Sequence, residues 1–135
     1  MKNLTIIAEI NNLETVIDFV LGNLKKYGCS KSVLLLIRLA VEELVGNIAR
    51  YASDPSVGPA EVRCEVLEDP LRVVIQFLDG GKPFDPLAKE DADTSEDALL
   101  DREGGLGILL VKETMDDVSY TYENGKNILT IFKRL

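Results

Sequence analysis

The stretch Arg102-Glu-Gly-Gly-Leu-Gly-Ile-Leu-Leu-Val111 joins a glycine-rich loop to an apolar run with helical spacing. Backbone N–H groups at such a helix start, together with the helix dipole, favour a bound anion. Taken alone, the stretch fits an ordinary loop equally well, because paired glycines are common before helices. Its meaning depends on the other segments that could complete a pocket around it.

The chain has 135 residues, which suits one compact domain. Its composition, 46% hydrophobic and 28% charged, is that of an ordinary globular protein, and a net charge of -8 argues against nucleic-acid binding. The absence of histidine excludes His-based catalysis and zinc sites, and Cys29 and Cys64 are expected to be buried thiols. No run is apolar enough for a signal peptide or a membrane span, so we expect a cytoplasmic protein without membrane contacts.

Hydrophobic periodicity predicts a β-α-α-β-β-flap-α-β-β order. The expected helices are Leu13–Lys26, Lys31–Ala52 after a Ser30 N-cap, and Gly107–Met115; the expected strands are Leu4–Ile10, Glu61–Leu67, Leu71–Leu78, Val118–Glu123 and Lys126–Phe132. A highly charged stretch from Ala88 to Glu103 is expected to be a flap, and Asn124-Gly125 is a strong hairpin signal. We therefore expect an α+β fold, a two-layer sandwich with helices on one face of a single sheet.

The second expected helix carries a polar pair beside its apolar stripe. Glu43 and Asn47 are four residues apart and share one flank, Arg50 continues the row, and Glu42 falls on the opposite side. A carboxylate can accept a proton from a hydroxyl group, and an Asn oxygen can bind Mg²⁺. The alternative is a solvated helix edge with a simple Glu–Asn contact.

Asp79 directly follows the apolar strand Val73-Val-Ile-Gln-Phe-Leu78 and precedes two glycines. A carboxylate at a strand end can accept a hydrogen bond from an amino group such as that of adenine, and Gly81 allows a flat ring to approach the backbone. An ordinary Asp-Gly turn is the alternative.

Together these segments resemble a known family. Glu43-x-x-x-Asn47, Asp79-x-Gly81-x-Pro83-Phe84 and Gly105-x-Gly107 occur in the order of the N, G1 and G2 boxes of the GHKL ATPase superfamily. Asp-x-Gly-x-Pro-Phe-Asp-Pro, Arg-Glu-Gly-Gly-Leu-Gly and Met-Asp-Asp-Val are similar to the bacterial anti-sigma-factor serine/threonine kinases of the sporulation and general-stress type. The resemblance covers residues 1–135 as a single ATP-binding domain.

The resemblance implies a Bergerat fold with a mixed, mainly antiparallel sheet and a flexible ATP lid at about residues 85–104. It assigns catalytic roles to Glu43, as general base, and to Arg102, near the terminal phosphate. Asn47 corresponds to the Mg²⁺ ligand and Asp79 to the adenine-binding carboxylate. The remaining residues implied to bind ATP or ADP are Arg50, Gly81, Phe84, Gly104, Gly105, Leu106 and Gly107. Of the two adjacent carboxylates, only the i, i+4 spacing to Asn47 favours Glu43 over Glu42.

The function implied is phosphoryl transfer from ATP to a Ser or Thr of an anti-sigma factor antagonist, by a homodimeric kinase that also binds a sigma factor. Two alternatives stay open. One is a nucleotide-binding regulatory module of the same fold without turnover. The other is the catalytic domain of a split histidine kinase, whose phospho-acceptor would lie on another chain because this sequence has no histidine.

Overall fold

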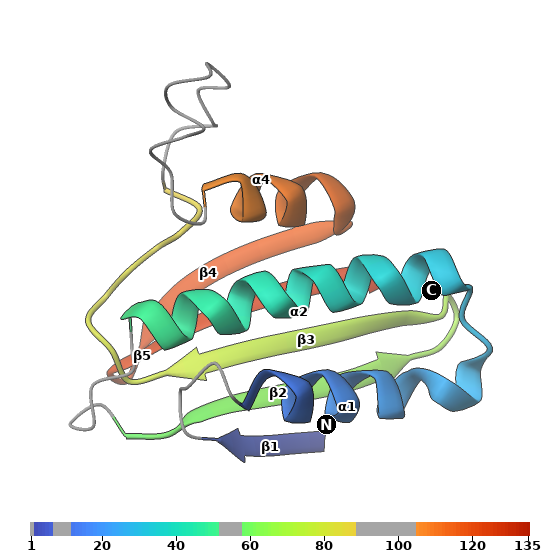
Figure 1. Cartoon of the computed structure of the whole chain (residues 1–135), viewed down its shortest axis with the longest axis horizontal. Helices are drawn as coiled ribbons and strands as arrows, with labels where there is room; N and C mark the ends of the chain where they lie inside the picture. Colours follow the sequence, from blue (N-terminus) through green and yellow to red (C-terminus); the bar gives the residue numbers. More distant parts are fainter. Residues whose placement is uncertain (1, 7–11, 52–57, 89–104) are drawn as a thin grey trace.

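The computed structural model describes residues 2–6, 12–51, 58–88 and 105–135. The strands of this part of the chain are β1 (Lys2–Ile6), β2 (Ala60–Leu67), β3 (Arg72–Asp79), β4 (Asp117–Glu123) and β5 (Lys126–Arg134). The helices are α1 (Leu13–Leu24), the 3-10 helix η2 (Lys25–Tyr27), α2 (Lys31–Tyr51) and α4 (Gly105–Thr114). The strands form one sheet in the order β1-β2-β3-β5-β4, and the helices cover one face of it (Figure 1). This arrangement confirms the predicted α+β sandwich.

In the described part of the chain, all four pairs of neighbouring strands are antiparallel. The sheet that these strands form is therefore purely antiparallel, whereas the predicted mixed sheet would need a parallel pair. The last strand, β5, lies in the interior of the sheet between β3 and β4. In the β3–β5 register, Asp79 is opposite Asn127. A residue at the end of β3 is thereby placed beside one from near the end of the chain.

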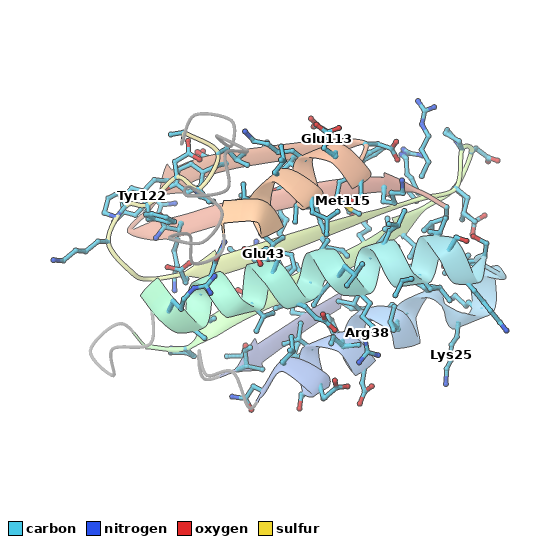
Figure 2. All side chains as sticks on the ribbon, turned by 45° about the horizontal axis from the view of Figure 1, so that its top comes forward. Lys25, Arg38, Glu43, Glu113, Met115 and Tyr122 are labelled. Atoms are coloured by element: carbon cyan, nitrogen blue, oxygen red, sulfur yellow. The ribbon has the colours of Figure 1, made fainter. Side chains whose placement is uncertain are left out.

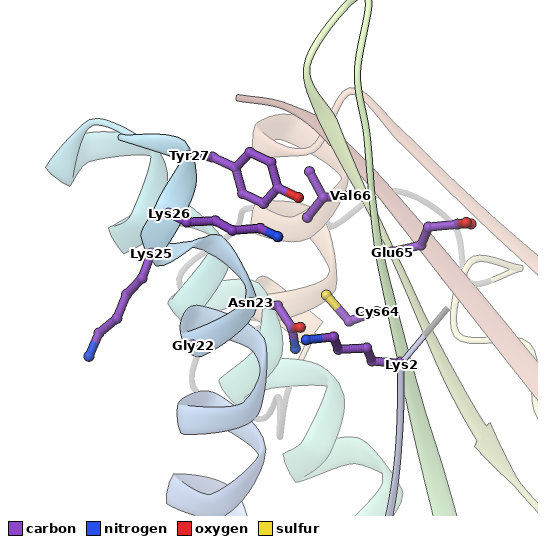
Figure 3. Close-up of a pocket in the computed structure, with 9 residues that line it drawn as sticks. All are labelled: Lys2, Gly22, Asn23, Lys25, Lys26, Tyr27, Cys64, Glu65 and Val66. Atoms are coloured by element: carbon purple, nitrogen blue, oxygen red, sulfur yellow. The ribbon is translucent and has the colours of Figure 1, made fainter.

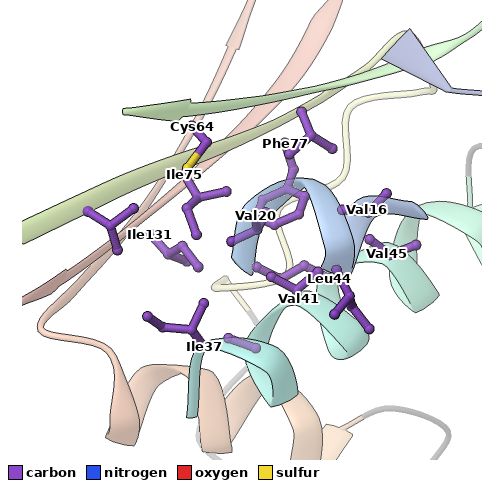
Figure 4. Packing of buried hydrophobic residues seen from close by; sticks show 14 of the residues in the cluster. Val16, Val20, Ile37, Val41, Leu44, Val45, Cys64, Ile75, Phe77 and Ile131 are labelled. Carbon is purple, nitrogen blue, oxygen red and sulfur yellow. The ribbon is translucent and has the colours of Figure 1, made fainter. Parts of the chain in front are cut away.

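The core lies between the helix layer and the sheet, as the two sequence periodicities predict. Alternate residues of β3 point inward, among them Ile75 and Phe77, and meet a stripe on α2 that includes Val41 and Leu44 (Figure 4). These side chains are at most 2% exposed. Complete burial of an aliphatic or aromatic side chain contributes roughly 1.5–3 kcal/mol, so this interface fixes α2 firmly on the sheet.

Local signals at the helix ends agree with the sequence. Ser30 Oγ accepts a hydrogen bond from Val33 N at 3.2 Å, which is the predicted N-cap contact of α2. Gly28 takes a left-handed conformation, φ 66°, at the turn between α1 and α2. No helix among the described residues is both long and apolar enough to cross a membrane.

The β4–β5 hairpin turns at Asn124 and Gly125, whose φ angles of 54° and 75° are those expected of the predicted Asn-Gly turn. Four elements have bounds that differ from the prediction by two residues or more. Helix α1 ends at Leu24 instead of Lys26, and β5 ends at Arg134 instead of Phe132. The first strand spans Lys2–Ile6 instead of Leu4–Ile10, with residues 7–11 outside the described part. Helix α4 starts at Gly105, two residues before the predicted Gly107. The predicted flap and lid lie largely outside the described residues, because the description omits 89–104.

Candidate functional site

The turn after β3 is built on the side chain of Asp79. Asp79 Oδ1 accepts a hydrogen bond from Gly81 N at 2.9 Å, which bends the backbone directly after the strand. This is the Asx type of turn, so the Asp-Gly turn considered from the sequence is present. It occupies only one carboxylate oxygen. In the part of the chain that the structure describes, both hydrogen bonds to Asp79 are made to Oδ1.

Asn127 is a central residue of this site that the sequence analysis did not identify. It is 7% exposed and lies at the start of β5, opposite Asp79. Its Nδ2 donates to Asp79 Oδ1 at 3.0 Å and to the Lys82 carbonyl oxygen at 2.9 Å. A signal did exist in the sequence: Asn127 shares its face of β5 with Leu129 and Ile131, where a polar residue is out of pattern.

A small cavity opens between α2, the turn and the β4–β5 hairpin. Asn47, Asp79 and Asn127 provide its polar lining, and the apolar wall includes Ile48, Phe77 and Leu129. Phe84, predicted to contact the nucleotide, also lines this cavity. The volume is about 50 Å³, whereas pockets for small-molecule ligands usually measure about 300–1,000 Å³. A purine ring therefore requires the wall to widen.

A larger hollow of about 360 Å³ lies between the end of α1 and strands β1 and β2. Its lining includes Lys2, Asn23, Lys26 and Cys64 (Figure 3). None of the predicted site residues lines it. Size alone would favour this hollow, but three of the predicted site residues, Asn47, Asp79 and Phe84, line the smaller cavity.

Glu43 lies on the side of α2 that faces α4 (Figure 2). Its side chain is 19% exposed, and Oε1 is buried without a hydrogen-bond partner in the described residues. Burial raises the pKa of Glu43 above its ordinary value, and the positive charge of Arg50 opposes that shift in part. A carboxylate with a raised pKa and an oxygen that lacks a donor is suited to accepting a proton.

Asn47 and Arg50 complete the polar flank of α2. Arg50 Nη2 donates to Asn47 Oδ1 at 2.5 Å and lies 3.8 Å from Glu43 Oε1. The three side chains are therefore brought together, as the helical spacing predicted. Asn47 Oδ1 and Glu43 Oε1 both face a cation, which shows that this flank has a donor set suited to positive charge.

The first turn of α4 packs directly against Glu43. A Cβ atom built on Gly107 would lie 2.0 Å from Glu43 Cδ and 2.0 Å from Oε2. Only glycine fits at this position without displacing the carboxylate. The contact places the glycine-rich helix start beside the polar flank of α2, as expected if the two elements form one site.

The structure brings some of the predicted site residues together, and others lie outside the residues that it describes. Asn47, Asp79 and Phe84 line one cavity, and Glu43 and Arg50 are close to Asn47. Gly105, Leu106 and Gly107 form the start of α4, and Gly107 lies against Glu43. Arg102 and Gly104 lie outside the described residues. Glu42 forms an ion pair with Arg38 at 3.2 Å on the outer side of α2, and Glu43 is the less exposed of the two carboxylates.

Mg²⁺ needs few ligands from the protein, since it usually keeps waters and binds phosphate oxygens as well. In the stretches that the structure describes, no group of three or more Asp, Glu or Cys side chains could hold a metal ion. The single amide oxygen of Asn47 beside the Glu43 carboxylate nevertheless fits a magnesium–nucleotide complex, in which the phosphates supply the other ligands.

Sequence comparison assigns the class of protein. Residues 6–133 match the family described as the histidine kinase-like ATPase domain, and the chain belongs to this family. Its motifs are those of the GHKL type. Serine-protein kinases RsbW of Staphylococcus aureus, for example those of strains JH9 and Newman, are 35% identical over 99 residues. That alignment spans 67% of this chain and 60% of each relative.

Solved structures show the same fold at lower sequence identity. A Mycobacterium tuberculosis protein with RsbU and RsbW domains matches with a TM-score of 0.67 and 18% identity, over 100% of this chain and 33% of that one. The SiaB–SiaC complex of Pseudomonas aeruginosa gives a TM-score of 0.62 and 16% identity, over 100% of this chain and 90% of the other. These two likenesses support the fold.

Proposed function

We propose that this protein is an ATP-dependent serine/threonine kinase of the anti-sigma-factor type. The observation that carries the proposal is Glu43, a half-buried carboxylate whose Oε1 is buried and accepts no hydrogen bond from the described residues. It lies against the first turn of α4, and on its own helix one turn before Asn47, which lines the small cavity. A hydroxyl group of a protein substrate would supply the missing donor and deliver its proton to this carboxylate.

The two ends of the proposed site have different roles. Asp79, Gly81 and Phe84 bind the adenine ring, after the small cavity widens. Asn47 would hold Mg²⁺, and Arg50 and the start of α4 would bind the phosphates. The ion would supply positive charge that offsets the charge of the phosphates, while the protein positions the reacting groups. Gly104 belongs to the same phosphate loop, and Arg102 is proposed as the second catalytic residue.

The proposed partners are an anti-sigma factor antagonist as phosphorylation substrate and a sigma factor as a second binding protein. Support comes from the similarity to serine-protein kinases RsbW. A homodimer in the cytoplasm is the proposed state of the kinase, and its role is in a circuit that regulates transcription through exchange of partners.

A labelled-phosphate assay tests this proposal. The purified protein is incubated with γ-labelled ATP, Mg²⁺ and an antagonist protein first identified by pull-down with ATP or ADP present. We expect acid-stable label on the antagonist with wild type and almost none with E43A. Acid-labile label would indicate a histidine kinase domain instead, since phosphohistidine is acid-labile and phosphoserine is not. Equal labelling by wild type and E43A would refute the assigned role of Glu43.

One contact favours a second candidate function, a regulatory module that binds nucleotide without turnover. Arg50 donates to the same Asn47 oxygen that Mg²⁺ requires, at 2.5 Å. If this contact persists with nucleotide bound, the metal has no amide ligand and phosphoryl transfer is disabled. Tight ATP binding with no labelled product over hours would establish this second function.

A further inference from the structure

Asn127 has more hydrogen bonds than its location on a strand requires. It is the one buried polar side chain among the residues described, and it contacts four separate parts of the site. Burying an amide is costly unless it is fully hydrogen-bonded. No role in nucleotide binding or catalysis has so far been given to it, so its network calls for an explanation.

The neighbours of Asn127 determine which way its amide points. Phe84 N donates to Asn127 Oδ1 at 3.0 Å, and the Tyr120 hydroxyl contacts the same oxygen. Nδ2 contacts the carbonyl oxygens of Gly81 and Lys82 at 3.3 Å and 2.9 Å. A backbone N–H can only donate and a carbonyl can only accept, so the opposite orientation of the amide would lose these bonds.

This fixed orientation limits what Asp79 can do. Asn127 presents only a donor to Asp79 Oδ1, at 3.0 Å, and Gly81 N presents a second donor to the same oxygen at 2.9 Å. Both hydrogen bonds that the described residues make to Asp79 go to Oδ1, so Oδ2 is the oxygen that could accept from a ligand, in a side chain that lines the cavity.

We propose that Asn127 is a positioning residue that makes the site select purines with an amino group at the 6-position. It fixes Asp79 as an acceptor and joins the backbone of residues 81, 82 and 84 to β5. This inference rests on the proposed nucleotide site. It adds that base selection depends on Asn127, which contacts Asp79 and the turn, although Asp79 is the residue that binds the amino group of the base.

Binding of two nucleotides tests the selection directly. ADP carries the 6-amino group and inosine diphosphate carries a carbonyl there, so their affinity ratio measures what Asp79 recognises. Wild type should prefer ADP. N127A should weaken ADP binding about 10- to 100-fold, with a much smaller change for inosine diphosphate. A purely structural defect would weaken both nucleotides alike, and an unchanged ratio would overturn the proposal.

A double-mutant cycle shows whether Asn127 acts through Asp79. If it does, D79A/N127A should bind ADP no more weakly than D79A, because the group being positioned is already absent. Additive losses would contradict that mechanism. N127D retains the size of the side chain and serves if N127A does not fold: it replaces the donor with an acceptor, and should also remove the preference for ADP.

Gln76 offers a matched control on the same pair of strands. Gln76 Nε2 donates to Thr130 Oγ1 at 3.3 Å, and neither residue lines the cavity. Q76A removes a β3–β5 side-chain bond without touching the site, so the ADP preference should stay that of wild type. If wild type binds no adenine nucleotide, the proposed function fails together with this inference. If wild type prefers ADP and N127A and N127D do so equally, only the role of Asn127 fails.

Discussion

The two ends of the proposed site are built in opposite ways. At the base end, Asp79 and Asn127 bond to each other and to the backbone of the turn, so the polar groups there are largely satisfied by the protein. At the phosphate end, Glu43 has a buried oxygen with no donor in the described residues, and Asn47 and Glu43 share a single arginine. The described residues thus preorganise the proposed base end and leave a buried acceptor without a donor at the proposed phosphate end.

This contrast has a physical basis. Recognition of a base is most selective when the binding groups cannot rearrange, because a wrong base then leaves a polar group unpaired. Proton transfer needs a carboxylate oxygen that can still accept a hydrogen bond from the substrate. If this contrast is correct, substitutions at the phosphate end should change the rate of phosphoryl transfer, and substitutions at the base end should change the affinity for ADP.

The largest expected effect is on the rate of phosphoryl transfer in E43Q. Removing a general base costs about 100- to 10,000-fold in rate, whereas ADP affinity should change by less than about 3-fold because Gln retains the shape of Glu. Single-turnover transfer and ADP titration measure the two quantities. E42Q is the matched control, since Glu42 pairs with Arg38 on the outer side of α2 and should transfer at the wild-type rate. Equal losses of rate and affinity in E43Q would contradict the separation.

D79N should act at the other end, with about 100-fold weaker ADP binding, because a charged acceptor is lost from a site that cannot rearrange. Calorimetric titration with ADP measures it. The control is D85N: Asp85 lies on the same loop, accepts a hydrogen bond from Leu87 N at 2.8 Å, and does not line the cavity. A weak effect of D79N, or a comparable effect of D85N, would show that the base end is not the selective one.

G107A should be about 1 kcal/mol less favourable to stability than the same change at an unobstructed helical glycine, since its methyl group would overlap the Glu43 carboxylate and that flexible side-chain end would have to move. Denaturant titration provides the measurement. In α1, an added Cβ at Gly22 meets nothing within 4 Å, so G22A should stabilise by up to about 1 kcal/mol through helix propensity. If G107A matched G22A, Glu43 would be free to move and the phosphate end would be less tightly packed than described.

The smallest expected effect concerns pH. Burial raises the pKa of Glu43 in the folded protein above its usual 4.5, so ionisation there destabilises the fold at neutral pH. E43Q should therefore be more stable than wild type near pH 7, by less than about 1 kcal/mol. The difference should shrink as the pH falls through the raised pKa and vanish below 4.5. Denaturant midpoints between pH 7 and pH 4 test it, and a difference that grows on acidification would mean that the pKa is lowered.

Much of the fold could be predicted because it depends on local patterns. The stripe on α2, the Ser30 cap and the Asn124-Gly125 turn are each encoded within a few neighbouring residues. The bounds of β1 and α4 could not be fixed in this way. A strand edge depends on its pairing partner, and a glycine-rich helix start depends on what packs against it.

The site residues were predicted from motifs, and the contacts between them were not. The row from Glu43 to Arg50 followed from helical spacing alone. The approach of Gly107 to Glu43 joins two distant segments, and no local pattern contains it. Asn127 was missed for the same reason, because its partners are residues 79–84 and Tyr120.

The interior position of β5 has a consequence for synthesis of the protein. Asp79 in β3 and Asn127 in β5 are separated by 48 residues in the chain. In the sheet, β5 lies between β3 and β4. Long-range strand pairing of this kind is a slow step in folding. A nascent chain emerging from the ribosome therefore lacks the Asp79–Asn127 contact until β5 has been made and inserted. The proposed base end is thus completed late, and chains that lack β5 would lack the residue that joins the turn to the sheet.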